Sequence, residues 1–201
     1  MSGQTPSQAA GAVSRIVLTG FMGAGKTTVG SQLAARLGWT FLDSDHVVEA
    51  RAGKTVAEIF ECSGEPAFRE MEAAAIRECL AGERLVLALG GGALEHSATR
   101  DLLAGTPNCL VVFLEASLET LVARCTGNEG AVRPVLADRS RLAARWAARL
   151  PWYRQADCTI STGDLTPQEI VGRIADFLDH PLSGDNPDQS PERRTEHGVS
   201  A

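Results

Sequence analysis

Short apolar runs alternate with longer amphipathic segments from residue 14 to about residue 180. Five runs are almost entirely apolar, which is typical of strands in a parallel sheet that helices cover on both faces; these predicted strands are 15–19, 40–42, 85–89, 110–114 and 158–161. Apolar residues at helical spacing predict helices at 26–37, 45–52, 56–62, 65–81, 97–104, 117–125, 139–149 and 167–178. The alternation predicts a three-layer α/β/α domain with a five-stranded parallel sheet and right-handed crossovers.

A glycine-rich loop follows the first predicted strand. Its sequence, Gly20-Phe21-Met22-Gly23-Ala24-Gly25-Lys26-Thr27, fits the pattern G-x-x-x-x-G-K-[ST] and stands between a strand and a helix, as a phosphate-binding loop requires. We expect Lys26 to contact the β- and γ-phosphates of a nucleoside triphosphate, and the Thr27 hydroxyl to bind Mg²⁺. An ordinary glycine-rich turn is the alternative, but the complete spacing favours the phosphate site. The expected nucleotide contacts are Gly23, Ala24, Gly25, Lys26, Thr27 and Thr28.

Two aspartates, Asp43 and Asp45, follow the second predicted strand. Residues two apart on an extended segment point the same way, so both carboxylates could face the cleft beside the phosphate loop. One could hold Mg²⁺, directly or through water, while the other accepts a proton from an attacking hydroxyl. Taken alone, the pair is better explained as helix-capping aspartates, and the adjacent phosphate loop reverses that preference.

An arginine and a triple glycine are further candidates for binding a ligand. Arg69 opens a predicted helix, where pairing with Glu65 or Glu72 on a solvated face is the commoner role. Gly90, Gly91 and Gly92 end a buried strand, and three glycines there leave bare backbone N–H groups where a ligand would lie. A flexible turn explains the glycines about equally well.

Composition excludes several classes of protein. Lys and Arg number 19 and Asp and Glu 25, a formal net charge of −6, which argues against non-specific binding to nucleic acid or anionic membranes. No apolar run approaches the ~20 residues of a membrane span. The five cysteines lack any C-x-x-C pair, which favours reduced thiols in a cytoplasmic protein. The polar ends, 1–13 and 181–201, are expected to be disordered, which leaves one domain over 14–180.

Several motifs, in this order along the chain, resemble the signature of the shikimate kinase family. They are the phosphate loop in its Gly20-Phe21-Met22-Gly23 form, Leu42-Asp43-Ser44-Asp45, Gly64-Glu65 before Phe68-Arg69, Arg69-x-x-Glu72-x-x-x-Ile76, and Val86-Leu87-Ala88-Leu89-Gly90-Gly91-Gly92-Ala93-Leu94. The resemblance runs from about residue 15 to residue 178, essentially the whole predicted domain. It implies a P-loop kinase fold with a mobile lid at about 124–138.

The resemblance also implies a reaction: transfer of the γ-phosphoryl group of ATP, with Mg²⁺, to the 3-hydroxyl of shikimate. Asp45 would hydrogen-bond the ring hydroxyls and act as base or orient the nucleophile. Lys26 and Arg133 would be the other catalytic groups, with Arg133 reaching the transferring phosphate from the lid. Thr27 and Asp43 would hold the metal. The resemblance further implies a monomer whose partner is a small-molecule substrate, shikimate.

For the acceptor, the resemblance implies that Arg69 and Arg149 hold the shikimate carboxylate and that Gly91 offers a backbone N–H. Phe60 and Phe68 match aromatic positions that line the pocket. Without the family, Arg149 is better explained as a helix-end cation and Arg133 as a loop arginine. Two other functions stay open: another small-metabolite P-loop kinase, similar to gluconate kinases, and a non-catalytic relative of shikimate kinases that binds a ligand or a partner.

Overall fold

A five-stranded parallel sheet forms the centre of the protein, which confirms the predicted fold class. The computed structural model describes residues 13–126 and 139–179. The strands lie in the order β2-β3-β1-β4-β5, and every neighbouring pair is parallel. Their bounds are β1 (Arg15–Thr19), β2 (Thr40–Asp43), β3 (Leu85–Ala88), β4 (Cys109–Glu115) and β5 (Cys158–Ser161).

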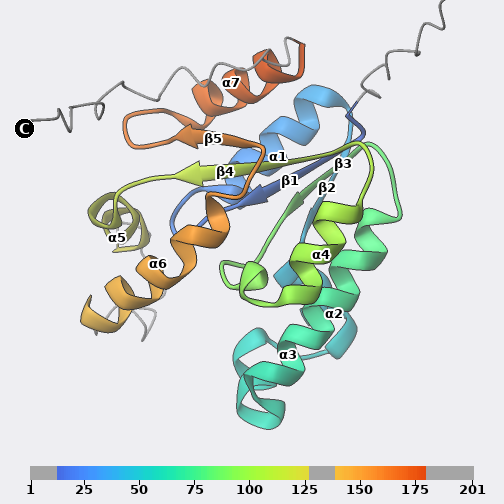
Figure 1. Ribbon diagram of the computed structural model, residues 1–201, viewed down its shortest axis with the longest axis vertical. Coiled ribbons are helices and arrows are strands. Elements are labelled where there is room, and N and C mark those ends of the chain that lie inside the picture. The colour runs from blue at the N-terminus through green and yellow to red at the C-terminus, as the bar shows by residue number, and fades with distance from the viewer. Residues whose placement is uncertain (1–12, 127–138, 180–201) are drawn as a thin grey trace, which may run out of the picture.

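Helices cover both faces of this sheet, because its central strands are apolar on both sides. In β1, Ile16, Val17 and Leu18 have no exposed surface, and Val17 pairs with Leu87 of β3 and Val111 of β4. Figure 1 shows α1 and α7 together on one side of the sheet and α4 and α6 on the other. The helices are α1 (Lys26–Leu37), α2 (Ser44–Ala52), α3 (Val56–Leu80), η1 (Ala93–Glu95), α4 (Ser97–Gly105), α5 (Leu118–Thr126), α6 (Arg139–Tyr153) and α7 (Pro167–Asp179).

The strand order fixes where a ligand can bind. After β1 the chain adds β2 and β3 on one side and then β4 and β5 on the other, so the direction of winding reverses at β1. Ligands of open α/β sheets bind outside the carboxyl ends of the strands at such a reversal. The loop 20–25 leaves β1 there, and the glycines 90–92 leave the neighbouring strand β3 at the same edge.

The helices differ from the predicted ones at three places. The two predicted helices 56–62 and 65–81 form one run, α3, which is kinked at Gly64 by a left-handed φ of 80°. Helix α6 continues past the predicted end to Tyr153. Pro151 lacks a backbone donor, but the following turn still closes, with Arg154 N donating to Leu150 O at 3.0 Å. The turn η1 was not predicted, since three residues are too few to show a periodic pattern.

Three predicted features lie outside the described residues: the tail 1–13 except for Val13, the tail 181–201, and positions 127–138 of the lid, which include Arg133. In the described ranges, no helix is both long enough and apolar enough to cross a membrane.

Glycine at position 30 allows α1 to pack closely on the sheet, and a larger residue at this position tests that packing. A Cβ at Gly30 would lie 2.5 Å from Phe41 Cε2 and 3.2 Å from Leu18 Cδ1. Gly30→Ala should therefore destabilise the fold, because overpacking costs about 1–3 kcal/mol whereas the gain in helix propensity is only about 1 kcal/mol. Urea denaturation measures the free energy of unfolding.

Gly172 of α7 provides the matched control, since a Cβ there meets no atom within 4 Å. Gly172→Ala should stabilise the protein by roughly 0.5–1 kcal/mol, the helix-propensity gain alone. Equal urea midpoints for the two variants would contradict the close packing at Gly30.

Candidate functional site

A cavity of about 720 Å³ opens at the carboxyl ends of the strands. The six predicted nucleotide contacts all line it, together with both aspartates and Gly91. The lining residues are Met22, Gly23, Ala24, Gly25, Lys26, Thr27, Thr28, Val29, Asp43, Asp45, His46, Leu89, Gly90, Gly91, Arg124, Leu165, Pro167 and Ile170. Segments that are far apart in the sequence thus meet around one space.

The loop 20–25 has the geometry of an anion cradle. Gly23 and Gly25 have left-handed φ angles of 78° and 89°, and a Cβ at Gly23 would lie 2.5 Å from Leu121 O. Helix α1 begins at Lys26 without a side-chain cap on its first N–H groups, so these donors and the positive end of the helix dipole face the cavity. Lys26 Nζ donates to Gly20 O at 2.8 Å and to Phe21 O at 3.1 Å, which holds the ammonium over the loop.

Asp43 links the phosphate loop to α2. Its Oδ2 accepts from Thr27 Oγ1 at 2.9 Å, and its Oδ1 accepts from Asp45 N at 3.1 Å, as the N-cap of α2. The helix-capping explanation therefore holds for Asp43, alongside its position in the cavity. A hydroxyl beside a carboxylate fits Mg²⁺, which keeps several waters and needs few protein ligands. Within the described ranges, no group of three or more His, Cys, Asp or Glu side chains is spaced to hold a metal by itself.

Asp45, in the first turn of α2, is partly buried at the edge of the cavity. Burial and the negative charge of Asp43 raise the pKa of Asp45, while Lys26 and Arg69 oppose that rise. Bare backbone lies against the carboxylate: a Cβ at Gly90 would come within 2.4 Å of Asp45 Oδ1. The adjacent Ser44 Oγ accepts from Gly90 N at 2.8 Å, which fixes the start of α2 against this backbone. Asp45 is therefore confined on one side and open to the cavity on the other.

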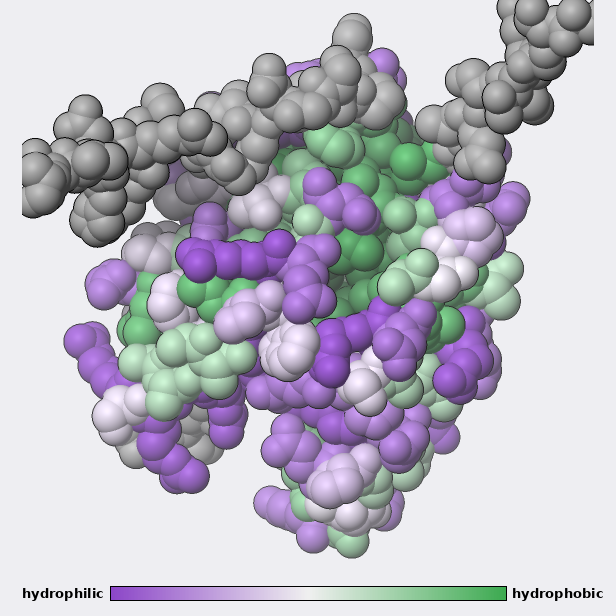
Figure 2. Space-filling model, viewed as in Figure 1, coloured by the Kyte–Doolittle hydropathy of each residue, from purple (hydrophilic) through white to green (hydrophobic). Residues whose placement is uncertain are grey.

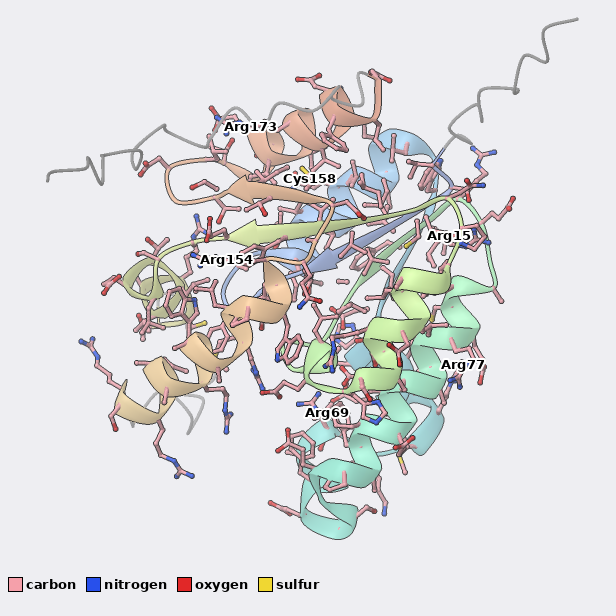
Figure 3. The ribbon with its side chains drawn as sticks, in the orientation of Figure 1. Arg15, Arg69, Arg77, Arg154, Cys158 and Arg173 are labelled. Carbon is pink, nitrogen blue, oxygen red and sulfur yellow. The ribbon has the colours of Figure 1, made fainter. Side chains whose placement is uncertain are left out.

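Arg69 lies on the inner face of α3, in the predicted place, but its surroundings are buried rather than solvated. Its side chain is 12% exposed, with Nη1 2.7 Å from Glu72 Oε2 and Nη2 2.8 Å from Glu65 Oε1. Figure 3 shows Arg69 directed toward the inside of the molecule, whereas Arg77 of the same helix points outward. Arg69 thus pairs with both acids expected from the sequence, but its side chain is largely buried and does not lie on a solvated face.

Glu72 is the buried acid that holds Arg69, with 1% of its side chain exposed. Burial raises the pKa of Glu72 to about 7, and the positive charge of Arg69 and its hydrogen bond limit the rise. Its second oxygen, Oε1, has no hydrogen-bond partner in the described part of the chain. A Cβ at Gly90 would lie 2.4 Å from that oxygen, so Glu72 and Asp45 both press on the same glycine.

Arg149 of α6 meets Arg69 at the glycine segment. A Cβ at Gly92 would lie 2.1 Å from Arg69 Nη2 and 2.8 Å from Arg149 Nη2, so both guanidinium groups pack directly on bare backbone. Tyr153, on the same helix, donates its hydroxyl hydrogen bond to Gly91 O and stacks on Phe113 at 5.2 Å. These contacts bring together two arginines that are far apart in the sequence, although neither lines the cavity beside them.

The cavity also contains residues that none of the sequence motifs marks, and Arg124, the first residue of the predicted lid range, belongs to its wall. Arg124 of α5 lines the cavity and donates to Thr162 Oγ1 at 3.1 Å, so it joins the far wall to the end of β5. Leu165, Pro167 and Ile170 complete that wall, and no motif in the sequence marks them. Glu95 lies 3.0 Å from Arg149 Nη2 and 3.7 Å from Arg69 Nη2, and it belongs to the unpredicted turn η1.

The two aromatic residues expected in the pocket lie together next to Arg69, and neither lines the 720 Å³ cavity. The Phe60 and Phe68 rings are 4.8 Å apart in an edge-to-face arrangement, and the Arg69 guanidinium lies 5.2 Å from the Phe68 ring centre. Phe68 is buried and Phe60 is partly exposed. Their packing supports the position of Arg69 and leaves an apolar surface beside it.

The raised pKa of the buried Glu72 carboxyl should make the stability of the protein depend on pH. Its pKa of about 7 in the folded protein exceeds the usual 4.5, so between these values the folded protein binds more protons than the unfolded chain. The free energy of unfolding then falls as pH rises through this range. Glu72→Gln cannot titrate, so the melting temperature of the variant relative to wild type should rise from about pH 4.5 to 7 and level off above. Glu61→Gln, at an exposed position of the same helix, controls for the loss of a charge, and a pH-independent difference for Glu72→Gln would contradict the raised pKa.

Comparison with known proteins identifies a family that this chain resembles over most of its length. A family model described as shikimate kinase matches residues 22–179. The shikimate kinase of Thermobifida fusca is 46% identical over 172 residues, which cover 84% of this chain and 96% of that protein. The shikimate kinase of Symbiobacterium thermophilum is 44% identical over 167 residues, which cover 81% of this chain and 95% of that protein.

Solved structures agree with the sequence matches. The shikimate kinase of Acinetobacter baumannii in complex with shikimate superposes with a TM-score of 0.75 at 34% identity, covering 88% of this chain and 98% of that chain. A gluconokinase from Sinorhizobium meliloti has a TM-score of 0.56 at 22% identity, a likeness of fold alone. The family model and the close relatives each span most of the chain, and so the chain belongs to the shikimate kinase family.

Proposed function

We propose that this protein is a shikimate kinase, which transfers the γ-phosphoryl group of ATP to the 3-hydroxyl of shikimate and yields shikimate 3-phosphate and ADP. The reaction is a step in the biosynthesis of chorismate and the aromatic amino acids. The observation that carries the proposal is the meeting of Arg69 and Arg149 at Gly92, next to Asp45 and the phosphate loop. A cyclic hydroxy acid could bind its carboxylate at the arginines and direct a hydroxyl toward the nucleotide.

The nucleotide would bind along the loop 20–25 and the first turn of α1. The backbone N–H groups at Gly23, Ala24 and Gly25 would hold the phosphates, and Lys26 would compensate their charge. Thr28 follows in the same turn and lines the same cavity. Arg124 and the apolar wall of Leu165 and Ile170 lie across the cavity and suit the base end of a nucleotide.

Thr27 and Asp43 would hold Mg²⁺ at the inner end of the phosphate loop. Their hydrogen bond of 2.9 Å brings one hydroxyl and one carboxylate oxygen to the same point, beside Lys26. Bound Mg²⁺ supplies neutralisation of phosphate charge. The remaining ligands would be phosphate oxygens and water.

The acceptor would be held by charge-assisted hydrogen bonds. A planar guanidinium pairs a carboxylate through two parallel N–H bonds, and two arginines at one point select an acceptor that carries a carboxylate. Gly91 would offer its backbone N–H, and Tyr153 holds the carbonyl of that residue in place. Asp45 would accept a hydrogen bond from the attacking hydroxyl.

Asp45 would orient the nucleophile and take up its proton. Phosphoryl transfer passes through a loose transition state, so positioning contributes at least as much as proton removal. Lys26 would stabilise the charge on the transferring group. We propose the same role for Arg133 on the family resemblance alone, because it lies outside the described residues. We also propose that the folded domain spans 14–180 and acts as a monomer, as the family resemblance implies, and that it is cytoplasmic, since its five cysteines include no C-x-x-C pair.

A coupled assay of ADP release tests the function. With ATP and Mg²⁺, shikimate should be phosphorylated, whereas gluconate and AMP should give only the background rate. Phosphorylation of gluconate with no activity on shikimate would favour another small-metabolite kinase. No turnover with any acceptor, together with tight shikimate binding, would favour a non-catalytic relative.

Asp45→Asn should abolish the reaction while nucleotide binding persists. The amide cannot accept the proton, and loss of a general base lowers kcat by roughly 10²–10⁴-fold. Calorimetric titration with a non-hydrolysable ATP analogue should give a wild-type dissociation constant. Asp101→Asn, at an exposed position of α4, is the matched control. A kcat within a few-fold of wild type for Asp45→Asn would remove Asp45 from the proposed chemistry.

Arg69→Ala and Arg149→Ala should each weaken shikimate more than ATP. Charge-assisted hydrogen bonds contribute about 1.5–3 kcal/mol each, so KM for shikimate should rise roughly ten- to a hundredfold, with a far smaller change in KM for ATP. Arg77→Ala, on the outer face of the same helix α3, controls for the loss of an arginine there. The opposite pattern, in which only ATP affinity drops, is incompatible with the proposed roles.

A further inference from the structure

The Glu95 carboxylate occupies the position between the two arginines assigned to the acceptor. Its Oε2 lies 3.0 Å from Arg149 Nη2 and 3.7 Å from Arg69 Nη2. The arginine side chains are only 9% and 12% exposed, whereas that of Glu95 is 37% exposed. One oxygen of an accessible side chain is thus shared by two largely buried cations.

The electrostatics of Glu95 match those of a bound carboxylate ligand. Partial burial acts to raise the pKa of Glu95, but the hydrogen bond from Arg149 and the positive charges of Arg149, Arg69 and Arg145 outweigh it and lower the pKa. Glu95 is therefore an anion under ordinary conditions. Its position and charge are those that the carboxylate of a hydroxy acid would have at the same two arginines.

Other sides of the guanidinium groups are already filled. Glu72 and Glu65 pair with Arg69, and both arginines press on Gly92, where even a Cβ would lie 2.1 Å from Arg69 Nη2. The group that both arginines share is Glu95. In Figure 2 a notch separates the lobe that contains α6 from the lobe that contains α3, the two helices that carry these arginines.

Glu95 also leaves part of Arg149 unsatisfied. Arg149 Nε is buried and has no hydrogen-bond partner in the described part of the chain. A buried donor without a partner is costly, and a carboxylate that binds an arginine side-on satisfies Nε and Nη2 together. Glu95 pairs with Nη2 alone, so a ligand carboxylate that also reaches Nε makes the better pair.

We propose that Glu95 is an internal competitor that must leave Arg69 and Arg149 before the carboxylate of the acceptor binds there. The proposal rests on the proposed function and deepens it, because it names a residue that sets the affinity for the acceptor. When a protein is competent to bind for only part of the time, the apparent dissociation constant rises by the inverse of that fraction. A neutral polyol makes no ion pair with the arginines and does not displace Glu95, so the competition acts on carboxylate acceptors alone.

The test compares Glu95→Gln with wild type by steady-state kinetics and by calorimetric titration with shikimate. Glutamine keeps the shape and removes the charge, so KM and Kd for shikimate should fall by about three- to tenfold, as expected for loss of a partly exposed ion pair. KM for ATP should stay at the wild-type value. Glu70→Gln is the matched control, because its carboxylate pairs with His96 rather than with the arginines, and it should leave KM for shikimate unchanged.

Glu95→Asp separates displacement from a general effect of charge. It keeps the charge and withdraws the carboxylate by one methylene, so displacement predicts a KM for shikimate between those of wild type and Glu95→Gln. Shikimate methyl ester, which has no carboxylate, should bind wild type and Glu95→Gln equally. These comparisons also give a second route to the answer if one variant folds poorly.

The outcomes distinguish the two proposals. If wild type does not phosphorylate shikimate, the proposed function fails. If wild type is active and Glu95→Gln has an equal or higher KM for shikimate, the function stands and the competition is wrong. A wild-type KM for Glu95→Asp, with a lowered KM for Glu95→Gln, would also overturn displacement in favour of a field effect.

Discussion

Two guanidinium groups packed against one bare stretch of backbone set the geometry of this site. Arg69 reaches Gly92 from α3 and Arg149 reaches it from α6, and a side chain at position 92 would overlap both. Cations largely removed from water are tolerated only with acids beside them, which explains the buried Glu72 and the more exposed Glu65 and Glu95 around the pair. The site is therefore built as a balanced set of charges in which the acids and the arginines hold each other in place.

Hydrogen bonds from the surrounding helices fix the glycine segment itself. Ser44 of α2 accepts a hydrogen bond from Gly90 N, and Tyr153 of α6 donates one to Gly91 O. The two helices are therefore bonded to two consecutive residues that follow β3. Asp45 follows Ser44, and Arg149 lies one helical turn before Tyr153. The same contacts that satisfy the backbone thus orient the groups proposed for chemistry and for binding. Pre-organisation of this kind removes part of the entropy cost of bringing reacting groups together.

Local patterns in the sequence predict most of the fold. The apolar runs predict all five strands of the sheet to within a residue at either end, because buried parallel strands are apolar on both faces. The phosphate loop is equally readable, since its spacing and its place between a strand and a helix are both local properties. Helix ends are harder to predict, because they depend on tertiary contacts: α6 continues one turn past its predicted end at Arg149, to Tyr153, whose hydroxyl bonds the glycine segment. The meeting of Arg69 and Arg149 is predicted by the family resemblance and not by the periodicity of apolar residues.

The rest of the site depends on contacts that no local pattern encodes. Glu95 belongs to a three-residue turn, and its importance comes from two arginines on other helices. Leu165, Pro167 and Ile170 look like ordinary core and capping residues in the sequence, and only the folding of α7 beside α1 brings them to the cavity. Glu72 is visible in the sequence as a partner of Arg69, but its burial, and hence its raised pKa, is a tertiary property.

The crowding at Gly90 and Gly92 limits how this protein can evolve. Any other amino acid at position 90 would collide with Asp45 and Glu72, and any other at position 92 would collide with the paired arginines. Substitutions at these two glycines therefore cannot adapt the site to new acceptors. Glu95, with its accessible side chain at the edge of the same cluster, is free of that restriction. Diversification of acceptor preference among descendants of this chain would then begin at the rim of the site, while its glycine floor stays invariant.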